Sequence, residues 1–351
     1  MDKKKLLMIF SFALLLCSCV SQSYDVQSVC EVTDLYNYVL KWEISPRMEG
    51  EVMIYSSNDP EKFDMRRCVA KEKISKGRAD IVVKGSLDRR YFLLKFDDET
   101  TSVVGVRAQK LEMVENFRDM GGYLNNDHQT LKWGKLYRSG NIDSIRGVNA
   151  KRIEKMRVRT LLDFRMNPFI TEAPKETGIP HYENLPIRTT RQNALPLILQ
   201  KKFKRGDAVI YMQDVSREMI LISGDSFKRM FEILSEEKNY PVILSCKYGN
   251  LQTSIAAALV LYALDVPEQS IIDDYLLSNR YFNMRKLAVI AYDLPLEYQD
   301  AITSMIISDE RYLMTAIDVV KRKYGSVNEY LKEELGVDEA YKNKLKAILL
   351  D

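Results

Sequence analysis

The hydrophobic pattern of this 351-residue chain changes once, near Gln109, and this change limits the folds that it can adopt. Between residues 28 and 109, short segments that largely alternate apolar and polar residues are separated by turn residues. This pattern is typical of an antiparallel β-sandwich. From residue 111 onward, apolar runs of strand length alternate with segments of helical periodicity, which indicates an α/β layered domain. We therefore predict a β-sandwich domain at residues 28–109 and an α/β domain at residues 111–351.

The charge and the metal-binding side chains of the sequence argue against several classes of function. The chain has 52 basic and 49 acidic residues, and this near balance gives no electrostatic reason to expect nucleic acid as a partner. Its two histidines, His128 and His181, and its few cysteines do not form a zinc-ligand spacing, so we predict no metal and no cofactor. Cys30 and Cys68 either pair as a disulfide or remain two buried thiols, and the sequence leaves both alternatives open.

The first residues have the features of a bacterial export signal. Three lysines, Lys3 to Lys5, precede an apolar run from Leu6 to Leu16 that is too short to span a bilayer. The run ends in Leu16-Cys17-Ser18-Cys19, which resembles a lipobox. We expect residues 1–18 to be a lipoprotein signal peptide, Cys19 to carry the lipid, and residues 19–27 to form a tether. The protein would then be anchored to a membrane and face the periplasm or the cell exterior. The alternative is that the first residues are an ordinary secretory signal that is cut nearby.

The segment from Val242 to Ser254 gives the strongest indication of a catalytic or binding site. It reads as a buried strand, a short loop that opens on Cys246, and the start of a very apolar helix. This order gathers backbone N–H groups and a helix N-terminus around one point, which favours anion binding and stabilises a thiolate. Gly249 allows the backbone to turn tightly inside the loop. Taken alone, one cysteine and one glycine favour a buried structural cysteine at the end of a strand over a catalytic one.

Several blocks elsewhere in the chain favour the catalytic interpretation. Residues 116–123 read Asn-Phe-Arg-Asp-Met-Gly-Gly-Tyr, and a Trp-Gly pair at 133–134 and an Arg-Ser-Gly run at 138–140 follow. With the cysteine loop, this ordered set resembles the bacterial tyrosine-phosphatase family over residues 111–350. The resemblance implies an α/β cysteine-phosphatase fold, with a central, mostly parallel sheet flanked by helices. The N-terminal region lies outside the match and resembles a fibronectin type III module at the level of the fold.

In active members of that family the loop reads His-Cys-x-x-Gly-Lys-Asp-Arg-Thr. The cysteine is the nucleophile and forms a phospho-cysteine, the arginine holds two phosphoryl oxygens, and the aspartate resembles the general acid. This chain retains Cys246, Gly249 and Thr253. The resemblance thus implies Cys246 as the nucleophile if the protein is active. The residues that it places in the phosphate-binding loop are Lys247, Tyr248, Gly249, Asn250, Leu251, Gln252 and Thr253.

Four loop positions depart from the family pattern. Ser245 replaces the histidine, Asn250 the lysine, Leu251 the acid and Gln252 the arginine. Loss of one oxyanion donor typically costs ~10²–10³ in rate, and loss of a general acid ~10²–10⁴. Multiplied as independent effects, the deficit is on the order of 10⁴–10⁷, although cooperating residues rarely multiply. Lys247 adds a nearby cation whose direction the sequence does not fix.

These observations favour a secreted lipoprotein with an impaired tyrosine-phosphatase-like domain that binds phosphorylated or otherwise anionic ligands. Its expected partners are a phosphorylated protein or a small phosphoester, and a membrane through the lipid anchor. One alternative is an active phosphatase that uses Cys246 as its nucleophile. The other is an interaction protein that acts through the β-sandwich, with the phosphatase domain as scaffold.

Other polar residues of the motifs have structural interpretations. We expect Arg118, Arg138 and Arg165 to hold the core turns of the domain rather than to contact a substrate. Tyr275 and Ser278 are expected to pack against or cap their helix. None of these five residues is therefore included among the predicted site residues.

The lipobox generates the first testable prediction. Substitution Cys19→Ala should release the protein from the membrane fraction, because the thiol that carries the lipid is absent. Fractionation of cells that express the natural and substituted proteins checks this outcome, with Cys17→Ala as the matched control that retains the anchor. Unchanged membrane attachment of the Cys19 variant would refute lipidation as the anchor.

Overall fold

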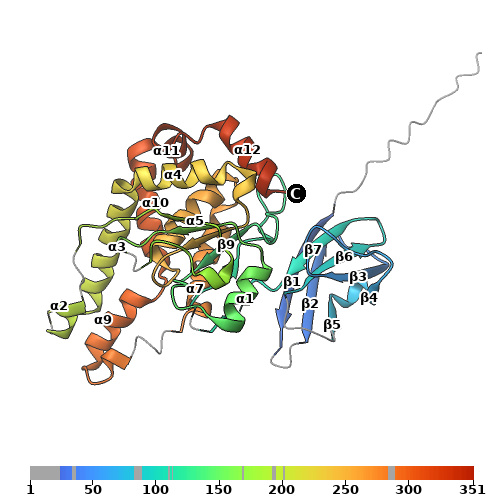
Figure 1. Cartoon of the computed structure of the whole chain (residues 1–351), viewed down its shortest axis with the longest axis horizontal. Coiled ribbons are helices and arrows are strands. Elements are labelled where there is room, and N and C mark those ends of the chain that lie inside the picture. The colour runs from blue at the N-terminus through green and yellow to red at the C-terminus, as the bar shows by residue number, and fades with distance from the viewer. Residues whose placement is uncertain are drawn as a thin grey trace, which may run out of the picture.

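The computed structural model describes residues 24–33, 37–82, 89–109, 111–112, 114–167, 170–191, 195–200, 202–283 and 289–351. The predicted signal peptide at residues 1–18 and the lipidation site at Cys19 lie outside the described residues. The described chain forms two regions side by side along the long axis of the molecule (Figure 1). We refer to them as the two-sheet region, which ends at Gly105, and the α/β region, which begins at Leu111. No helix in the described ranges is both long enough and apolar enough to cross a membrane.

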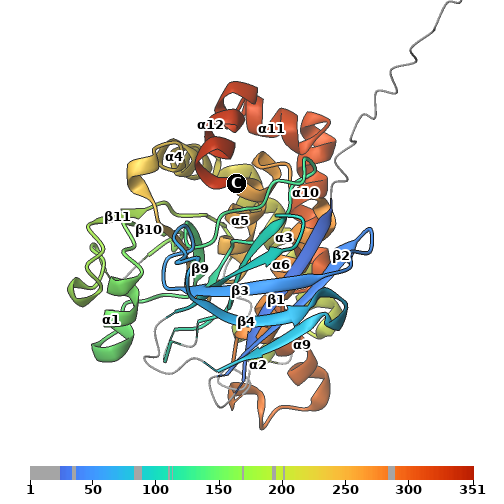
Figure 2. The same ribbon diagram turned by 90° about the vertical axis from the view of Figure 1, so that its right-hand side faces the viewer.

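The two-sheet region contains two antiparallel sheets that enclose one hydrophobic core. Strands of the first sheet, in spatial order, are β1 (Asp25–Val32), β2 (Tyr38–Ser45) and β5 (Arg78–Ile81). Those of the second are β4 (Cys68–Lys73), β3 (Glu51–Ser57), β6 (Tyr91–Phe96) and β7 (Thr101–Gly105). Alternate residues such as Leu40 and Trp42 point into the core, because successive side chains of a strand point to opposite faces. The two sheets overlap in the view of Figure 2. Strand β1 begins at Asp25, so the last residues of the predicted tether belong to a strand.

The two cysteines of this region lie in different sheets and are both free. Cys30 is buried in β1, where burial raises the pKa of its thiol to about 12. Cys68 lies exposed on β4, so the alternative of two buried thiols is correct only for Cys30. The alternative of a disulfide between them is wrong.

The α/β region is built around a five-stranded sheet. Its strands, in spatial order, are β11 (His181–Asn184), β10 (Thr160–Asp163), β12 (Val242–Ser245), β9 (Leu136–Ser139) and β8 (Arg118–Asp119). All neighbouring pairs are parallel except β8 with β9 at one edge. The prediction of a central, mostly parallel sheet flanked by helices is therefore confirmed.

Helices cover both faces of this sheet (Figure 1). The α-helices are α1 (Gly147–Lys155), α2 (Leu195–Leu199), α3 (Arg205–Ile222), α4 (Gly224–Leu234), α5 (Leu251–Ala263), α6 (Glu268–Leu276), α7 (Ser278–Tyr281), α9 (Leu296–Ile306), α10 (Glu310–Tyr324), α11 (Val327–Glu333) and α12 (Glu339–Leu349). Short 3-10 helices lie at η1 (Ile74–Lys76), η2 (Lys175–Thr177), η3 (Glu237–Asn239) and η4 (Val289–Ala291). Three late helices begin at side-chain caps, which satisfy N–H groups of the first turn: Asp309, Ser326 and Asp338.

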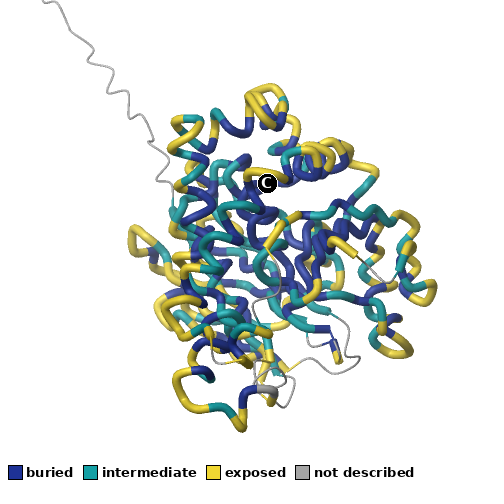
Figure 3. The backbone as a smooth tube through the Cα atoms, turned by 90° about the vertical axis from the view of Figure 1, so that its left-hand side faces the viewer, coloured by how far each residue is buried: buried dark blue, intermediate teal, exposed yellow. Residues whose placement is uncertain are grey.

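The central strand β12 is buried on both faces, because successive side chains point to opposite sides. Val242 and Leu244 pack in the larger core with α5, a helix that is apolar nearly all round. Ile243 packs on the other face, in the core that contains α1. Figure 3 shows these buried segments in the centre of the molecule, with exposed residues on the outer loops. The loop that follows β12 therefore starts from a rigid support.

A buried interface joins the two regions. The Arg89 guanidinium and the Asp119 carboxylate form a 2.6 Å ion pair with both side chains nearly inaccessible to solvent. Trp133 of the α/β region packs in the core of the two-sheet region, and its Nε1 donates to the Val103 carbonyl at 2.9 Å. The connecting segment pairs with the edge strand β8, since Asp119 N donates to the Arg107 carbonyl at 2.9 Å. The connection between the two regions is thus part of a packed interface.

This interface generates a prediction about stability. Substitution Arg89→Ala should lower the free energy of unfolding by about 3–5 kcal/mol, because it leaves the Asp119 carboxylate buried without its cation. Denaturant unfolding of the whole chain measures the loss. The matched control is Lys135→Ala, which removes a 2.8 Å pair with the exposed Glu61 across the same interface and should cost less than about 1 kcal/mol. Similar losses for the two variants would contradict a role for the buried pair.

Candidate active site

Cys246 lies at the carboxyl end of the central strand, in the loop between β12 and α5. The predicted order of strand, loop and helix is present, and the cysteine is buried, with 3% of its surface exposed. The backbone N–H of Cys246 donates to the Ser139 carbonyl at 3.4 Å. Ser245, at the family's histidine position, donates from Oγ to the Gly140 carbonyl at 3.0 Å. Both contacts tie the start of the loop to the end of strand β9.

The backbone shape of the loop requires a glycine at position 249. Its φ is +65°, and a Cβ at this position would lie 2.5 Å from the Gly140 nitrogen. The Gly249 carbonyl accepts hydrogen bonds from Asn116 Nδ2 at 2.6 Å and from Arg138 Nη2 at 3.0 Å. Two side chains from the motif blocks thus fix the orientation of this peptide.

The backbone N–H groups of the loop are available to a ligand. From Lys247 to Thr253, none of these groups has a hydrogen-bond acceptor among the described residues. The Lys247 carbonyl, by contrast, accepts from Asn141 N at 3.3 Å. The Thr253 hydroxyl is fully buried and likewise has no partner within the described part of the chain. A row of unpaired donors at a helix N-terminus forms an anion-binding cradle.

Gln252, at the family's arginine position, is occupied with backbone groups outside the loop. Its Nε2 donates to the Phe164 carbonyl at 3.0 Å and to the Ile187 carbonyl at 2.9 Å. These carbonyls lie just beyond strands β10 and β11. The side chain therefore connects helix α5 to the neighbouring loops and carries no positive charge.

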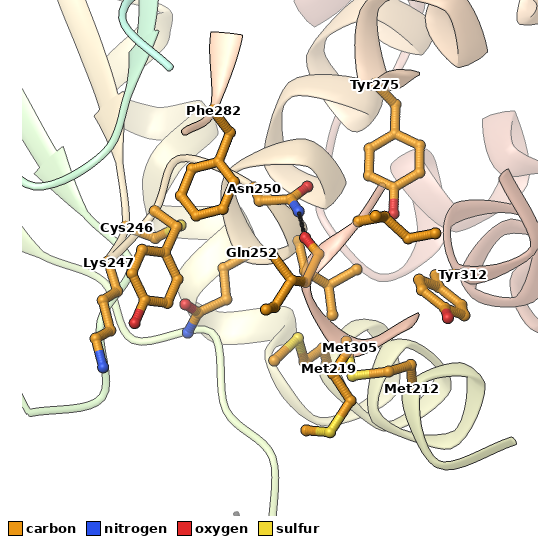
Figure 4. A pocket seen from close by; sticks show the side chains of 14 residues that line it. Met212, Met219, Cys246, Lys247, Asn250, Gln252, Tyr275, Phe282, Met305 and Tyr312 are labelled. Atoms are coloured by element: carbon orange, nitrogen blue, oxygen red, sulfur yellow. Dashed lines mark hydrogen bonds between the residues drawn. The ribbon is translucent and has the colours of Figure 1, made fainter. Parts of the chain in front are cut away.

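Asn250, at the family's lysine position, is held by the last residue of α9 and by the segment that follows it. Its Nδ2 donates to the Ile306 carbonyl at 3.2 Å, and its Oδ1 accepts from the Ser308 hydroxyl at 2.8 Å. The dashed line in Figure 4 marks the first of these bonds. The amide thus stabilises one wall of the site rather than presenting a cation to it.

A cavity of about 170 Å³ opens beside the loop. The residues that line it are Met212, Met219, Cys246, Lys247, Tyr248, Asn250, Leu251, Gln252, Tyr275, Phe282, Met305, Ile306, Ile307 and Tyr312. In Figure 4 the three methionines lie together on one side, and Lys247 lies on the other side and points away from them. The Lys247 Nζ is 5.0 Å from the centroid of the Tyr248 ring, which fits a cation–π contact. Among the described residues that line the cavity, none is acidic.

A buried ionic network lies behind the loop. Asp274 accepts from Arg118 Nε at 3.3 Å and from Arg138 Nη1 at 2.5 Å. Burial alone would raise the pKa of Asp274, but the charges of the two arginines outweigh burial and hold this pKa well below its usual range. Burial, and then repulsion from Arg138, lower the pKa of Arg118 to about 10. Arg118 also donates to the Asn116 side chain, which reaches the Gly249 carbonyl.

This network confirms the structural interpretation of Arg118 and Arg138. Ser278 does more than cap its helix, because its Oγ accepts from Arg118 Nη2 at 3.2 Å. Asn116 and Asp274 were not among the predicted site residues, although both stand in the motif blocks. A signal for Asp274 is its position four residues before Ser278, near the end of the predicted helical segment, where side chains four residues apart can lie close together.

Arg165 is held by two carboxylates and is not available to an anion. Its Nη1 is 2.6 Å from Asp143 Oδ2, and its Nη2 is 2.6 Å from Asp163 Oδ2. This arrangement agrees with the prediction that Arg165 supports the turn after β10. In the described ranges, no three His, Cys, Asp or Glu side chains gather in a way that could hold a metal ion. The site therefore combines a thiol and an anion cradle with no acidic group in the lining.

Comparisons with known proteins agree with this arrangement. The model of the tyrosine phosphatase family matches residues 109–351. A Cupriavidus necator protein that carries the name of a tyrosine-protein phosphatase is 26% identical over 249 residues, which cover 68% of this chain and 88% of the relative.

Two solved structures are also similar, at levels too low to carry an argument about function. The catalytic domain of the yeast phosphatase Siw14 gives a TM-score of 0.30 at 15% identity, over 58% of this chain and 93% of that chain. TpbA of Pseudomonas aeruginosa gives a TM-score of 0.23 at 15% identity, over 50% of this chain and 89% of that chain. The match to the family model alone spans well over half of the sequence. The chain belongs to the tyrosine phosphatase family.

Proposed function

We propose that this protein is a lipoprotein whose tyrosine-phosphatase-like domain has impaired catalysis and binds phosphorylated or other anionic ligands. The observation that carries the proposal is the position of Gln252. Its amide nitrogen donates to the Phe164 and Ile187 carbonyls, so the place of the family's arginine holds a neutral side chain engaged with protein backbone. A guanidinium would neutralise phosphoryl oxygens, and a carboxamide cannot.

Ligand binding is supported by the parts of the loop that remain. The N–H groups from Lys247 to Thr253 have no acceptor in the described chain, and the Gly249 peptide is held by Asn116 and Arg138. Such a cradle attracts an anion without help from charged side chains. The cavity beside Cys246 provides space for the rest of the ligand.

Impaired turnover is supported by the lack of a carboxylic acid among the described residues of the lining. Leu251 stands at the position of the family's acid, and no acidic residue occurs among the described residues that line the cavity. When the leaving group has a high pKa, a phospho-cysteine forms readily only if that group receives a proton. Together with the missing arginine, this loss corresponds to a rate deficit on the order of 10⁴–10⁷.

An active phosphatase is the second candidate. It is favoured by the retained Cys246 at the centre of an intact cradle and by the fully buried Thr253 hydroxyl, which has no partner in the described chain. In this alternative the Cys246 sulfur attacks phosphorus, the bond from phosphorus to the ester oxygen breaks, and water takes up the thiol proton or protonates the leaving oxygen. A second water molecule then hydrolyses the phospho-cysteine to inorganic phosphate and the free thiol. Leaving groups with a low pKa, which need no acid, are the substrates that such a site would accept.

The N-terminal assignments are part of the same proposal. Seven strands divide into three and four, with the first, second and fifth in one sheet, which supports a fibronectin type III-like sandwich. If Cys19 carries the lipid, the six residues up to Asp25 reach at most about 20 Å, so the two-sheet region would lie close to the membrane. The interface at Arg89 and Asp119 would then fix the cavity relative to that membrane surface.

A purely scaffolding role through the two-sheet region is the third candidate function.

The first prediction for this site concerns turnover. We expect the purified protein to hydrolyse an aryl phosphate no faster than its Cys246→Ser variant, because neither the cation nor the acid is present. A colorimetric assay with a leaving group of low pKa is the most permissive measurement. Brisk hydrolysis that disappears in Cys246→Ser would contradict the impaired-enzyme proposal and establish the second candidate.

The second prediction concerns restoration. The triple substitution Asn250→Lys, Leu251→Asp and Gln252→Arg should give a partial gain in turnover, because it restores charge and a proton donor on an unchanged backbone. The matched control carries Leu251→Asn in place of Leu251→Asp and should improve phosphate binding more than turnover, since departure of the leaving group needs the acid. Calorimetry with phosphate and an aryl phosphate assay measure the two effects. A triple variant that neither binds nor turns over would favour the scaffolding candidate.

A further inference from the structure

We propose that the cavity beside Cys246 selects a monoanionic head group attached to a small apolar body, in preference to a phosphomonoester dianion. This inference rests on the proposed function, because the anion site is the same loop. It goes further by naming the charge and the size of the ligand.

The charge of the ligand follows first from the residues that line the cavity. Among those described, Lys247 is the one charged side chain, and its ammonium group lies against the Tyr248 ring. Asn250 and Gln252 are neutral, and their amide nitrogens donate to the protein carbonyls of Ile306, Phe164 and Ile187. The lining therefore offers at most one positive charge.

The charged side chains behind the loop do not line the cavity. Arg118 and Arg138 share Asp274, and the charge of Arg107 also acts on this carboxylate, but none of these three arginines is among the lining residues. On the other side, Arg165 is paired with both Asp143 and Asp163 and contributes one net negative charge. Lys247 is therefore the one cation among the described residues that line the cavity.

One cation in the described lining matches a monoanion. The cost of removing an ion from water grows with the square of its charge, so the second negative charge of a dianion costs more than the first. Active members of the family offset that cost with an arginine and a lysine. Here the backbone N–H groups supply hydrogen bonds, but the described residues of the lining include no second cation to offset the second charge.

The apolar body follows from the rest of the lining. Met212 and Met219 of α3 and Met305 of α9 lie together on the side away from Lys247 (Figure 4). Methionine side chains adapt to irregular apolar ligands. The volume of about 170 Å³ is close to that of an engineered apolar cavity of ~150 Å³ that holds benzene. The body that fits is thus about one aromatic ring or a short alkyl chain.

Calorimetric titration of the full natural chain tests both features with three probes that resist hydrolysis. Phenylphosphonate, at a pH where it carries two charges, is compared with its monomethyl ester, which carries one charge at any such pH. We expect the ester to bind on the order of tenfold more tightly or better. The third probe, the monomethyl ester of methylphosphonate, has the same charge and no ring. It should bind at least about tenfold more weakly than the phenyl ester, because it buries little apolar surface.

A matched pair of variants separates charge from side-chain loss. Asn250→Lys and Asn250→Met both remove the bonds to Ile306 and Ser308, but only the first adds a cation. The Lys variant should reduce or reverse the preference for the ester, and the Met variant should retain it. Thermal unfolding of both variants confirms that they are folded.

Each outcome has a distinct meaning. If phenylphosphonate binds the natural protein as tightly as its ester, the charge inference is overturned while the proposed anion-binding function stands. If the two esters bind equally, the inference about the apolar body is overturned. Absence of binding by all three probes overturns this inference together with the proposed ligand-binding function.

Discussion

The peptide carbonyl of Gly249 is the group on which the site depends. Asn116 and Arg138 hold it from behind, while the close approach of Ser139 and Gly140 leaves no room for a side chain at this position. The N–H groups from Lys247 to Thr253 have no hydrogen-bond acceptor in the part of the chain that the structure describes. The buried network around Asp274 holds Arg138 in place, so the shape of the loop is independent of any charge inside the cavity. This independence explains how the loop keeps its form although the family's cations are absent.

Two of the replaced residues have acquired structural contacts. Gln252 joins α5 to the segments after β10 and β11, and Asn250 joins the loop to the segment before α10. Both therefore stabilise the walls of the cavity rather than its contents. Leu251 adds an apolar surface where an acid stands in active relatives. The side chains at these three positions are uncharged, and the strand, loop and helix around Cys246 are nevertheless formed.

The two-sheet region packs directly against strands of the α/β region. Strands β8 and β9 have one set of side chains, Asp119 and Tyr137, in contact with Arg89 of the two-sheet region. The alternate residues, Arg118 and Arg138, belong to the network behind the loop. Because successive side chains of a strand point to opposite sides, one pair of short strands connects the interface to the site. A displacement of the two-sheet region would therefore act on strands that also carry the support of Gly249.

The sequence by itself determined the change of architecture near Gln109, the strand-loop-helix order around Cys246, and the family, because periodicity and motif spacing are local properties. It also predicted that Arg118 and Arg138 support the core. Only the tertiary structure decided where Gln252 donates its hydrogen bonds, that Cys30 and Cys68 lie in different sheets, and that Trp133 packs into the two-sheet region. These facts depend on contacts between residues far apart in the chain. Such contacts are set by how the sheets and helices pack together, which no local pattern encodes.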